Sequence, residues 1–435
     1  MEYIHRIIDK KIDEKINAFG AINIVGPKGC GKTRTAKERC NTIIEFQDED
    51  KRDGYIAVAE TSPGLFLKNE KPILFDEWQD APKIWGTVRK ACDDTPEGTG
   101  MFYLTGSTSK KIQTPHTGTG RISEIKMFPM TCFETGESNG KISISKLFDD
   151  NSYDIDGISN GTNFEELFFA ICRGGWPRCL ALKSDTAKLE IAKDYYYQIY
   201  KKDISSIDGV KRNAELARTL MWSYARNMAT LAKKKNIYSD VKATNNVTDV
   251  TLNSYIECLE NLFVIMDVDA WTPQIRSKTA IRAAKKHIFV DPSIGLAALG
   301  LSPQYFYNDL DMFGHAFENL VLRDLIAYAN VQDARVMHYS DDFGLEADAV
   351  YQLSDGRYAL IEVKTGANAI SMAEKNLLKF REVIKKHNEK MLSNEKHPGV
   401  VYREPDLLII ICAQLPMAYT TESGVKVIPF DCLRD

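Results

Sequence analysis

The sequence predicts an α/β protein of several domains, the first of which is a parallel sheet covered by helices. Strand-like and helix-like segments alternate over residues 1–135, as a parallel sheet with crossover helices requires. A glycine-rich segment at 26–33 joins an apolar strand to the start of a helix. The expected parts are an α/β domain over 1–135, a linker and helical region over 136–210, a helical domain over 211–300 and a second α/β domain over 301–435.

Length and composition limit the class of protein. At 435 residues, with 44% hydrophobic and 27% charged residues, the chain is long enough for several cores and has an ordinary globular composition. A formal net charge of −4 excludes a molecule that binds polyanions over its whole surface. The nine cysteines are scattered without a C-x-x-C pair, which indicates a reducing compartment and argues against structural zinc. No apolar run approaches about 18 residues, so we expect a cytoplasmic protein without a membrane segment.

Residues 26–33 read G-P-K-G-C-G-K-T, which has the spacing of a phosphate-binding loop. The glycines allow backbone N–H groups to surround a β-phosphate, and the start of the next helix adds positive potential. Lys32 would reach the β- and γ-phosphates of ATP, and the Thr33 hydroxyl would hold Mg²⁺. The residues expected to bind the nucleotide are Gly26, Pro27, Lys28, Gly29, Cys30, Gly31, Lys32 and Thr33.

Two carboxylates end the apolar strand at 72–77. Asp76 at the strand tip can bind the magnesium, and Glu77 next to it can polarise the attacking water. A solvated acidic turn is the alternative. It would explain a single carboxylate, but it explains a pair of carboxylates after four apolar residues less well. The strand and the loop together predict hydrolysis of the nucleotide as well as binding.

The strand at 101–107 ends in hydroxyl groups. Thr105 or Ser107 can bond the γ-phosphate or the attacking water, while a plain capping turn is equally compatible with the sequence. Arg121 follows a loop rich in glycine and threonine and can stabilise charge on the γ-phosphate, in cis or from a neighbouring subunit of a homo-oligomer. An ordinary surface arginine is the alternative.

The middle of the chain predicts two helices followed by a hairpin, which is the layout of a winged helix. A helical stripe follows Asp249, a strand is expected over 262–268, and a basic strand pair is expected over 271–290. Residues 211–287 contain 13 Lys and Arg against 7 Asp and Glu, so a local face could contact DNA phosphates. A solvated or protein-docking surface is the alternative. Most of the excess charge comes from Lys233, Lys234, Lys235, Arg276, Lys278, Arg282, Lys285 and Lys286.

A third set of charged residues lies near the end of the chain. An amphipathic helix over 313–328 carries Glu318, a strand over 345–351 carries Asp348, and the strand over 358–364 carries Glu362 and Lys364. Glu362 and Lys364 share one strand face, so an opposing Asp348 would complete a hard-oxygen site for Mg²⁺ or Mn²⁺. A helix over 372–386 and a strand over 407–412 then complete a nuclease-type order of elements. An exposed, charged hairpin is the alternative.

Together these motifs resemble a prokaryotic family of AAA+ superfamily ATPases that carry a C-terminal DUF4143 domain. The resemblance implies a Walker A loop at 26–33, a Walker B strand around Asp76 and Glu77, and a sensor 1 strand at Thr105. It further implies a central winged helix and a restriction-endonuclease-like, or PD-(D/E)xK, C-terminal fold. The later motifs that carry the resemblance are Gly120-Arg121, Met127–Met130, Gly174–Pro177, Lys286–Asp291, Ala316–Asn319, Ala347-Asp348 and Ile361–Lys364.

The function predicted from these features is Mg²⁺-dependent ATP hydrolysis coupled to a module that contacts DNA. The alternative is a nucleotide-gated docking protein, in which Glu318, Asp348, Glu362 and Lys364 perform no chemistry.

Overall fold

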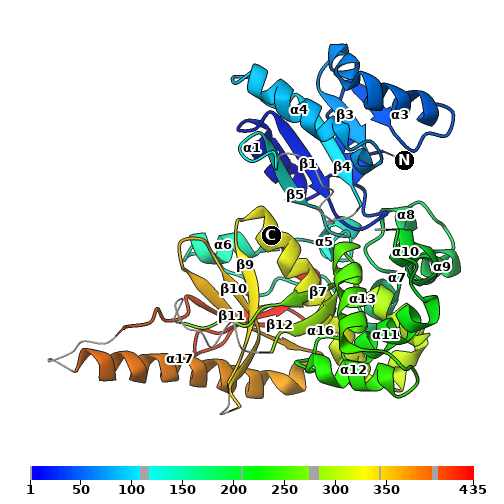
Figure 1. Cartoon of the computed structure of the whole chain (residues 1–435). Coiled ribbons are helices and arrows are strands. Elements are labelled where there is room, and N and C mark those ends of the chain that lie inside the picture. The colour runs from blue at the N-terminus through cyan, green and yellow to red at the C-terminus, as the bar shows by residue number, and fades with distance from the viewer. Residues whose placement is uncertain (1, 108–116, 207–208, 274–283, 342–343, 394–399) are drawn as a thin grey trace.

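The computed structural model describes residues 2–107, 117–206, 209–273, 284–341, 344–393 and 400–435 (Figure 1). The chain folds into an N-terminal α/β domain, a helical region and a C-terminal domain built on a mixed sheet (Figure 1). Within the described residues, no helix combines the length and apolar character that crossing a membrane requires.

The N-terminal domain contains the predicted parallel sheet. Its strands are β1 (Ala21–Val25), β2 (Thr42–Glu45), β3 (Ile73–Asp76), β4 (Phe102–Gly106) and β5 (Ile122–Lys126). They pair in the order β2-β3-β4-β1-β5, and every pair is parallel. All residues of β1, β3 and β4 are buried, which explains why these strands read as continuous apolar runs.

Helices cover both faces of this sheet. The helices are α1 (Ile8–Ile16), α2 (Lys32–Lys37), α3 (Arg52–Thr61) and α4 (Lys83–Asp94), with 3₁₀ turns η1 (Pro63–Lys68) and η2 (Trp78–Asp80). Ile22 and Ile24 of β1 pack in one core with residues of α1 and α2. Ala21 of the same strand packs in the opposite core with residues of α3 and α4. The alternation of side chains along β1 therefore separates the two helical layers.

The helical region begins with short elements and continues with longer helices. The elements are α5 (Cys132–Thr135), β6 (Ile142–Ser143), α6 (Ile144–Asp149), α7 (Phe164–Arg173), α8 (Pro177–Leu180), α9 (Asp185–Gln198), the π-helical turn η3 (Ile199–Asp203), α10 (Ile204–Ser206), α11 (Ala214–Arg226), α12 (Lys234–Lys242), α13 (Asp249–Asn261), β7 (Ile265–Val268), β8 (Lys286–Phe289), α15 (Pro292–Leu299) and η4 (Pro303–Tyr307). Strands β7 and β8 pair antiparallel after the three helices α11, α12 and α13.

The hairpin differs from the one predicted over 271–290. Its first strand is Ile265–Val268, and its second is Lys286–Phe289. The expected strand over 262–268 starts later because Leu262 still caps α13 and Phe263 turns the chain with a positive φ of 55°. The part of the predicted pair at 274–283 lies outside the described residues.

The C-terminal domain is a sheet of six strands in the order β13-β14-β12-β11-β10-β9. The elements are α16 (Leu310–Val331), β9 (Arg335–Ser340), β10 (Glu346–Gln352), β11 (Tyr358–Lys364), η5 (Ala367–Ala369), α17 (Ile370–Leu392), β12 (Leu407–Cys412), β13 (Tyr419–Thr420), β14 (Lys426–Pro429), η6 (Phe430–Cys432) and β15 (Leu433–Arg434). The predicted order of helix, strand, strand, helix and strand is present, and β9 is an additional edge strand.

The two long helices of this domain pack on opposite faces of the sheet. Ile361 of β11 belongs to the core that contains α16, whereas Leu360 belongs to the core that contains α17. The first of these cores is continuous with the helical region, since it also contains Leu220 of α11 and Phe289 of β8. The helical region and the α16 face of the sheet therefore share one hydrophobic core.

Candidate functional site

The phosphate-loop sequence forms a tight turn between β1 and α2. Three of its glycines have positive φ values, 156° at Gly26, 73° at Gly29 and 108° at Gly31. A Cβ atom at Gly26 would lie 2.1 Å from the main-chain oxygen of Met127, so only glycine fits that position. The backbone geometry expected of a phosphate cradle is therefore built by these residues.

Lys32 is buried beneath this loop. Its Nζ donates hydrogen bonds to the carbonyl oxygens of Gly26 at 3.0 Å and Pro27 at 2.9 Å. Both acceptors are neutral, so the positive charge is held inside the loop without a carboxylate partner among these bonds. Lys32 is thus positioned where an anion could replace the carbonyl groups as its acceptor.

The carboxylate of Asp76 joins three elements of the site. Oδ1 accepts hydrogen bonds from Thr33 Oγ1 at 2.6 Å and from Thr105 Oγ1 at 2.5 Å. Strand β4 lies between β1 and β3, so Thr105 at its end reaches Asp76 on the neighbouring strand. Burial raises the pKa of Asp76 above its usual value, although both hydroxyl hydrogen bonds oppose that rise.

Glu77 turns away from β3 in a left-handed conformation, with φ 52° and ψ 49°. This backbone conformation costs roughly 1–3 kcal/mol for a residue other than glycine. The Glu77 N–H donates to Thr105 Oγ1 at 3.1 Å, and its Oε2 accepts from Ser107 at 3.0 Å and from the Gln79 side chain. The strained turn therefore places a second carboxylate beside the ends of β3 and β4.

The four predicted residues of the C-terminal site also lie together. Lys364 Nζ lies 2.5 Å from Glu362 Oε2 and donates to Asp348 Oδ2 at 3.3 Å. Glu318 of α16 instead pairs with Lys286 of β8. Burial raises the pKa of Glu318 and of Glu362, and the Asp348 carboxylate raises both further. Among the described residues, no group of three or more His, Cys, Asp or Glu side chains is arranged to hold a metal ion.

Models of known protein families match three parts of the chain. The model of an AAA domain matches residues 18–136, and the DUF4143 model, a domain of unknown function, matches residues 313–432. The chain carries an AAA-type ATPase domain followed by a C-terminal DUF4143 domain. A further domain of unknown function, DUF8612, matches residues 164–305 between them. The AAA domain supports nucleotide binding and hydrolysis as the general activity.

Similar solved structures are distant from this chain. The Walker-type ATPase PABY2304 of Pyrococcus abyssi is 13% identical, with 68% of this chain and 96% of that chain covered at a TM-score of 0.41. PCH-2 of C. elegans is 11% identical, with 58% of this chain and 65% of that chain covered at a TM-score of 0.18. Neither likeness carries a functional argument. No curated protein matches the chain.

Arg121 of the AAA domain lies far from the loop of its own chain. It directly precedes β5, whose first residue Ile122 pairs with Ala21 at the start of β1. The phosphate loop follows the other end of β1, so the sheet separates the two. The Arg121 guanidinium donates to Asp93 Oδ1 at 2.6 Å and to the carbonyl oxygen of Thr119 at 3.1 Å. The structure therefore does not bring Arg121 to its own nucleotide site.

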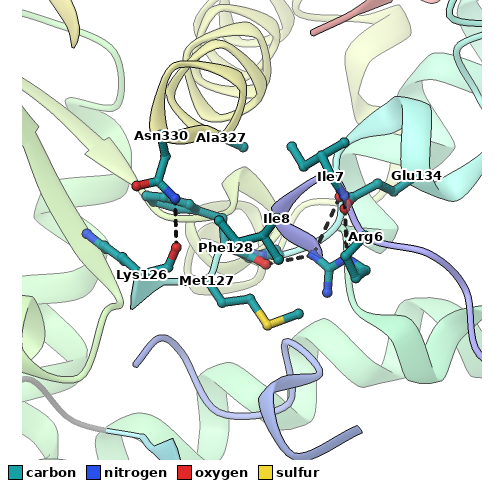
Figure 2. Close-up of a pocket in the computed structure, with 10 residues that line it drawn as sticks. Arg6, Ile7, Ile8, Lys126, Met127, Phe128, Glu134, Ala327 and Asn330 are labelled. Carbon is teal, nitrogen blue, oxygen red and sulfur yellow. Dashed lines mark hydrogen bonds and ion pairs between the residues drawn. The ribbon is translucent and has the colours of Figure 1, made fainter. Parts of the chain in front are cut away.

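Arg6 supports the AAA loop and was not identified from the sequence. Figure 2 shows its guanidinium beside Glu134 and the main chain of Phe128. Its guanidinium donates to the carbonyl oxygens of Cys30 at 2.7 Å and Phe128 at 2.9 Å, and pairs with Glu134 at 2.8 Å. Those partners are 24 to 128 residues away in sequence, so no local pattern marks this arginine. Arg6 connects the loop to the first helix of the helical region.

A cavity of about 310 Å³ opens beside the loop. Gly31 of the loop lines it together with Tyr3 and Ile4 from the N-terminal segment and Pro177 from the helical region. Pro177 belongs to the Gly-Gly-Trp-Pro motif at 174–177, one of the later motifs that carry the family resemblance. No local sequence pattern indicates that this motif reaches the phosphate loop.

Lys28 in the loop points toward the helical region. Its Nζ lies 2.6 Å from Asp203 Oδ1 in the π-helical turn η3. About half of the Lys28 side chain is exposed, whereas that of Asp203 is 15% exposed. This ion pair is a second connection between the loop and the helices that follow the AAA domain.

The predicted basic face is smaller than its charge count suggested. Lys286 is buried and paired with Glu318, so it is not part of a surface. Lys285 pairs with Asp269 at 2.9 Å. Lys233 and Lys235 at the start of α12 are exposed. Three further basic residues lie outside the described residues, namely Arg276, Lys278 and Arg282.

Proposed function

We propose that the AAA domain binds ATP with Mg²⁺ and cleaves the β–γ phosphate bond. The observation that carries this proposal is the Asp76 carboxylate, which contacts the Thr33 hydroxyl of the loop at 2.6 Å and the Thr105 hydroxyl at 2.5 Å. These contacts join the loop, the Walker B strand and the neighbouring strand at one point. Such a constellation is the one that phosphoryl transfer to water requires.

The residues at this point suit Mg²⁺. Thr33 Oγ1 and the Asp76 carboxylate are oxygen donors, which this cation prefers, and they already lie within direct contact of each other. When bound, Mg²⁺ would neutralise charge on the β- and γ-phosphate oxygens. The buried Asp76 would gain from that cation, because burial disfavours its ionised form.

Glu77 is the proposed base for the attacking water. Its carboxylate accepts hydrogen bonds from Ser107 and Gln79, which orient it at the end of β4. Lys32 would exchange the carbonyl oxygens of Gly26 and Pro27 for phosphate oxygens. The left-handed backbone at Glu77 is consistent with a functional constraint at this residue.

The adenine base would occupy the cavity beside Gly31. Tyr3, Ile4 and Pro177 offer it an aromatic and apolar wall next to the phosphate loop. Tyr3→Ala should then weaken ATP binding about tenfold, by loss of base contact, while the affinity for inorganic triphosphate stays the same. Equal losses for both ligands would place the base elsewhere.

Two variants test hydrolysis directly. Lys32→Ala should lose ATP binding in calorimetry, whereas Glu77→Gln should retain binding and lose at least about 100-fold in phosphate release. Lys37→Ala in the same helix and Glu70→Gln are matched controls, because Lys37 pairs with Glu45 and Glu70 is exposed. Normal turnover by Glu77→Gln would refute the assignment of the base.

The role proposed for Arg121 is to stabilise charge on the γ-phosphate of a nucleotide bound to a neighbouring subunit. Arg121 lies on the edge of the sheet away from its own loop, so it could reach a nucleotide only in a neighbouring subunit of a homo-oligomer. Mixing inactive Arg121→Ala with inactive Lys32→Ala should then restore turnover in mixed assemblies. No recovery, with assembly verified by light scattering, would remove this role.

A second component of the proposal is DNA contact through a winged-helix-like unit. Helices α11, α12 and α13 precede the antiparallel pair β7 and β8, and Lys233 and Lys235 are exposed at the start of α12. Replacing Lys233, Lys234 and Lys235 by glutamate should weaken DNA retention and its salt dependence. The same change at Lys379, Lys385 and Lys386, exposed on α17, is the control. Unchanged retention would favour the docking alternative.

A further inference from the structure

A buried lysine lies inside the carboxylate cluster of the DUF4143 domain. Lys286 is 6% exposed and opens β8, which falls in the DUF8612 match and outside the DUF4143 match. Its Nζ pairs with the Glu318 carboxylate, donates to the main-chain oxygen of Asp348 at 3.2 Å and lies 3.8 Å from Asp348 Oδ1. A charge buried this deeply has to be compensated, and these oxygen atoms compensate it.

These oxygen atoms are of the chemical type that a divalent cation binds, although the described side chains are not arranged around a metal position. Carboxylates together with a main-chain carbonyl are typical ligands of Mg²⁺ and Mn²⁺. On the other side of the cluster, Lys364 lies 2.5 Å from Glu362 Oε2 and 3.3 Å from Asp348 Oδ2. Each carboxylate thus has an ammonium partner, and a divalent ion added to this space would be repelled by Lys286 at short range.

The position of Lys286 is set by hydrogen bonds between the main chain of Phe289 on the same strand and the side chain of Asn319 on α16. The N–H of Phe289 donates to Asn319 Oδ1 at 2.9 Å, and Asn319 Nδ2 donates to the Phe289 carbonyl at 2.9 Å. Asn319 is fully buried and follows Glu318 on α16. This reciprocal pair keeps β8 in a single position against α16, which keeps the ammonium group opposite Glu318.

We propose that Lys286 is a built-in replacement for the divalent cation of a nuclease-like site. In this interpretation, the cluster of Glu318, Asp348 and Glu362 joins the helical region to the DUF4143 domain and binds no metal in the wild-type protein. The inference goes beyond the proposed ATPase and does not depend on nucleotide binding.

Lys286→Met tests this replacement, because it removes the ammonium group and keeps an unbranched side chain of similar length. The nucleotide-free full-length protein is titrated with Mn²⁺, and bound Mn²⁺ is counted by electron paramagnetic resonance. Each protein is compared with a version that also carries Asp348→Asn, so that Mn²⁺ bound elsewhere, including at Asp76, cancels. Lys285→Met is the matched control, since Lys285 is half exposed and pairs with Asp269.

We expect Lys286→Met to gain one Asp348-dependent Mn²⁺ ion and to melt at a higher temperature when Mn²⁺ is added. The wild type and Lys285→Met should gain neither. A folded Lys286→Met without the new site would overturn the proposal. If Lys286→Met does not fold, Lys286→Gln replaces it.

The wild-type protein tests the proposal without any change at Lys286. Asp348-dependent Mn²⁺ binding by the wild type would contradict it, as would plasmid nicking in Mn²⁺ that disappears in Glu362→Ala. Equal Mn²⁺ counts for the wild type and Asp348→Asn, with no such nicking, would support it. None of these results bears on ATP turnover, so failure here and failure of the proposed ATPase are distinguishable.

Discussion

The AAA domain and the DUF4143 domain each bring lysine and carboxylate side chains to one site, but the two sites pair these groups differently. In the AAA domain, Asp76 Oδ1 accepts hydrogen bonds from the hydroxyl groups of Thr33 and Thr105. The nearby Lys32 donates to main-chain carbonyl oxygens and not to that carboxylate. The Lys32 ammonium group and the Asp76 carboxylate therefore each form these hydrogen bonds with neutral groups.

In the DUF4143 domain, the carboxylates are bound to ammonium groups. Glu318 pairs with Lys286, while Asp348 and Glu362 pair with Lys364. A metal ion would otherwise compensate the negative carboxylates, and a phosphate would otherwise compensate the positive lysines. In this cluster the lysines and carboxylates already compensate each other.

Residue type alone therefore does not distinguish a binding site from a structural ion cluster. Neutral hydroxyl and carbonyl partners are weakly held and can be exchanged for a charged ligand. Removing a buried ammonium group would leave its carboxylate partners buried without a compensating charge, which is strongly unfavourable. The first site is therefore suited to a ligand, and the second is suited to holding two parts of the chain together.

The largest expected effect comes from removing one carboxylate in each domain. Asp76→Asn should lower steady-state phosphate release by at least about 100-fold, because it removes the charge proposed to hold Mg²⁺. Asp348→Asn should change phosphate release by less than about twofold, because its carboxylate lies in a separate cluster. Similar losses in both variants would mean that the two sites act as one, and the comparison would fail.

The next effect concerns stability and Arg6, the buried cation that supports the AAA loop. Arg6→Met should lower the free energy of unfolding by about 3 kcal/mol, since Glu134 would be left buried without its partner. Urea denaturation followed by circular dichroism measures this loss. The double variant Arg6→Met/Glu134→Gln should recover part of it. No recovery would show that the loss comes from packing and not from the uncompensated charge.

A pH effect on stability is expected from His338 on the DUF4143 side. Burial, and secondly the charge of Lys286, lowers the pKa of His338 from 6.5 to about 4. Its Nε2 faces the carbonyl oxygen of Ala284, and among the described residues its Nδ1 has no partner, so protonation would bury a second positive charge. The unfolded chain binds a proton below pH 6.5, and the folded chain does so only near pH 4. Stability from this group is therefore present above pH 6.5 and is lost as the pH falls toward 4.

His338→Gln should remove this acid sensitivity. Between pH 7 and 4.5, the wild type should lose about 2 kcal/mol more unfolding free energy than the variant. Urea denaturation at both pH values measures the difference, and His5→Gln, with an exposed side chain, is the control. A variant that loses as much as the wild type would show that His338 is not responsible.

The smallest effect is expected for the exposed ion pair of Lys28 with Asp203. A double-mutant cycle with Lys28→Ala and Asp203→Ala should give a coupling energy of about 0.5 kcal/mol, because the Lys28 side chain is about half exposed and screened by water. The cycle is measured by thermal unfolding at low and high salt. A coupling above about 2 kcal/mol that resists salt would place this pair among the buried ones.

Local patterns predicted several elements with little error. Strands β11 and β12 begin and end where the sequence placed them, because each is rich in apolar residues, most of them branched, and has clear boundaries. The hairpin of β7 and β8 was misplaced because its two strands are separated by many residues, and sequence pattern does not show which distant strands pair. Lys286 was assigned to a basic surface because the sequence pattern also does not show that it pairs with the distant Glu318.

The phosphate loop, the acidic strand end and the order of elements in both α/β domains could be predicted from the residues alone. These features depend on contacts between near neighbours, such as a glycine with positive φ or an apolar strand, and residue type reports them directly. Which charged side chains meet, in contrast, depends on the packing of distant parts of the chain. This packing brought Arg6 to Cys30 and Lys286 to Glu318, and it separated Arg121 from the loop of its own chain. Long-range pairing depends on how the strands are ordered and packed, and the same lysine can therefore be a surface charge or a buried counter-ion.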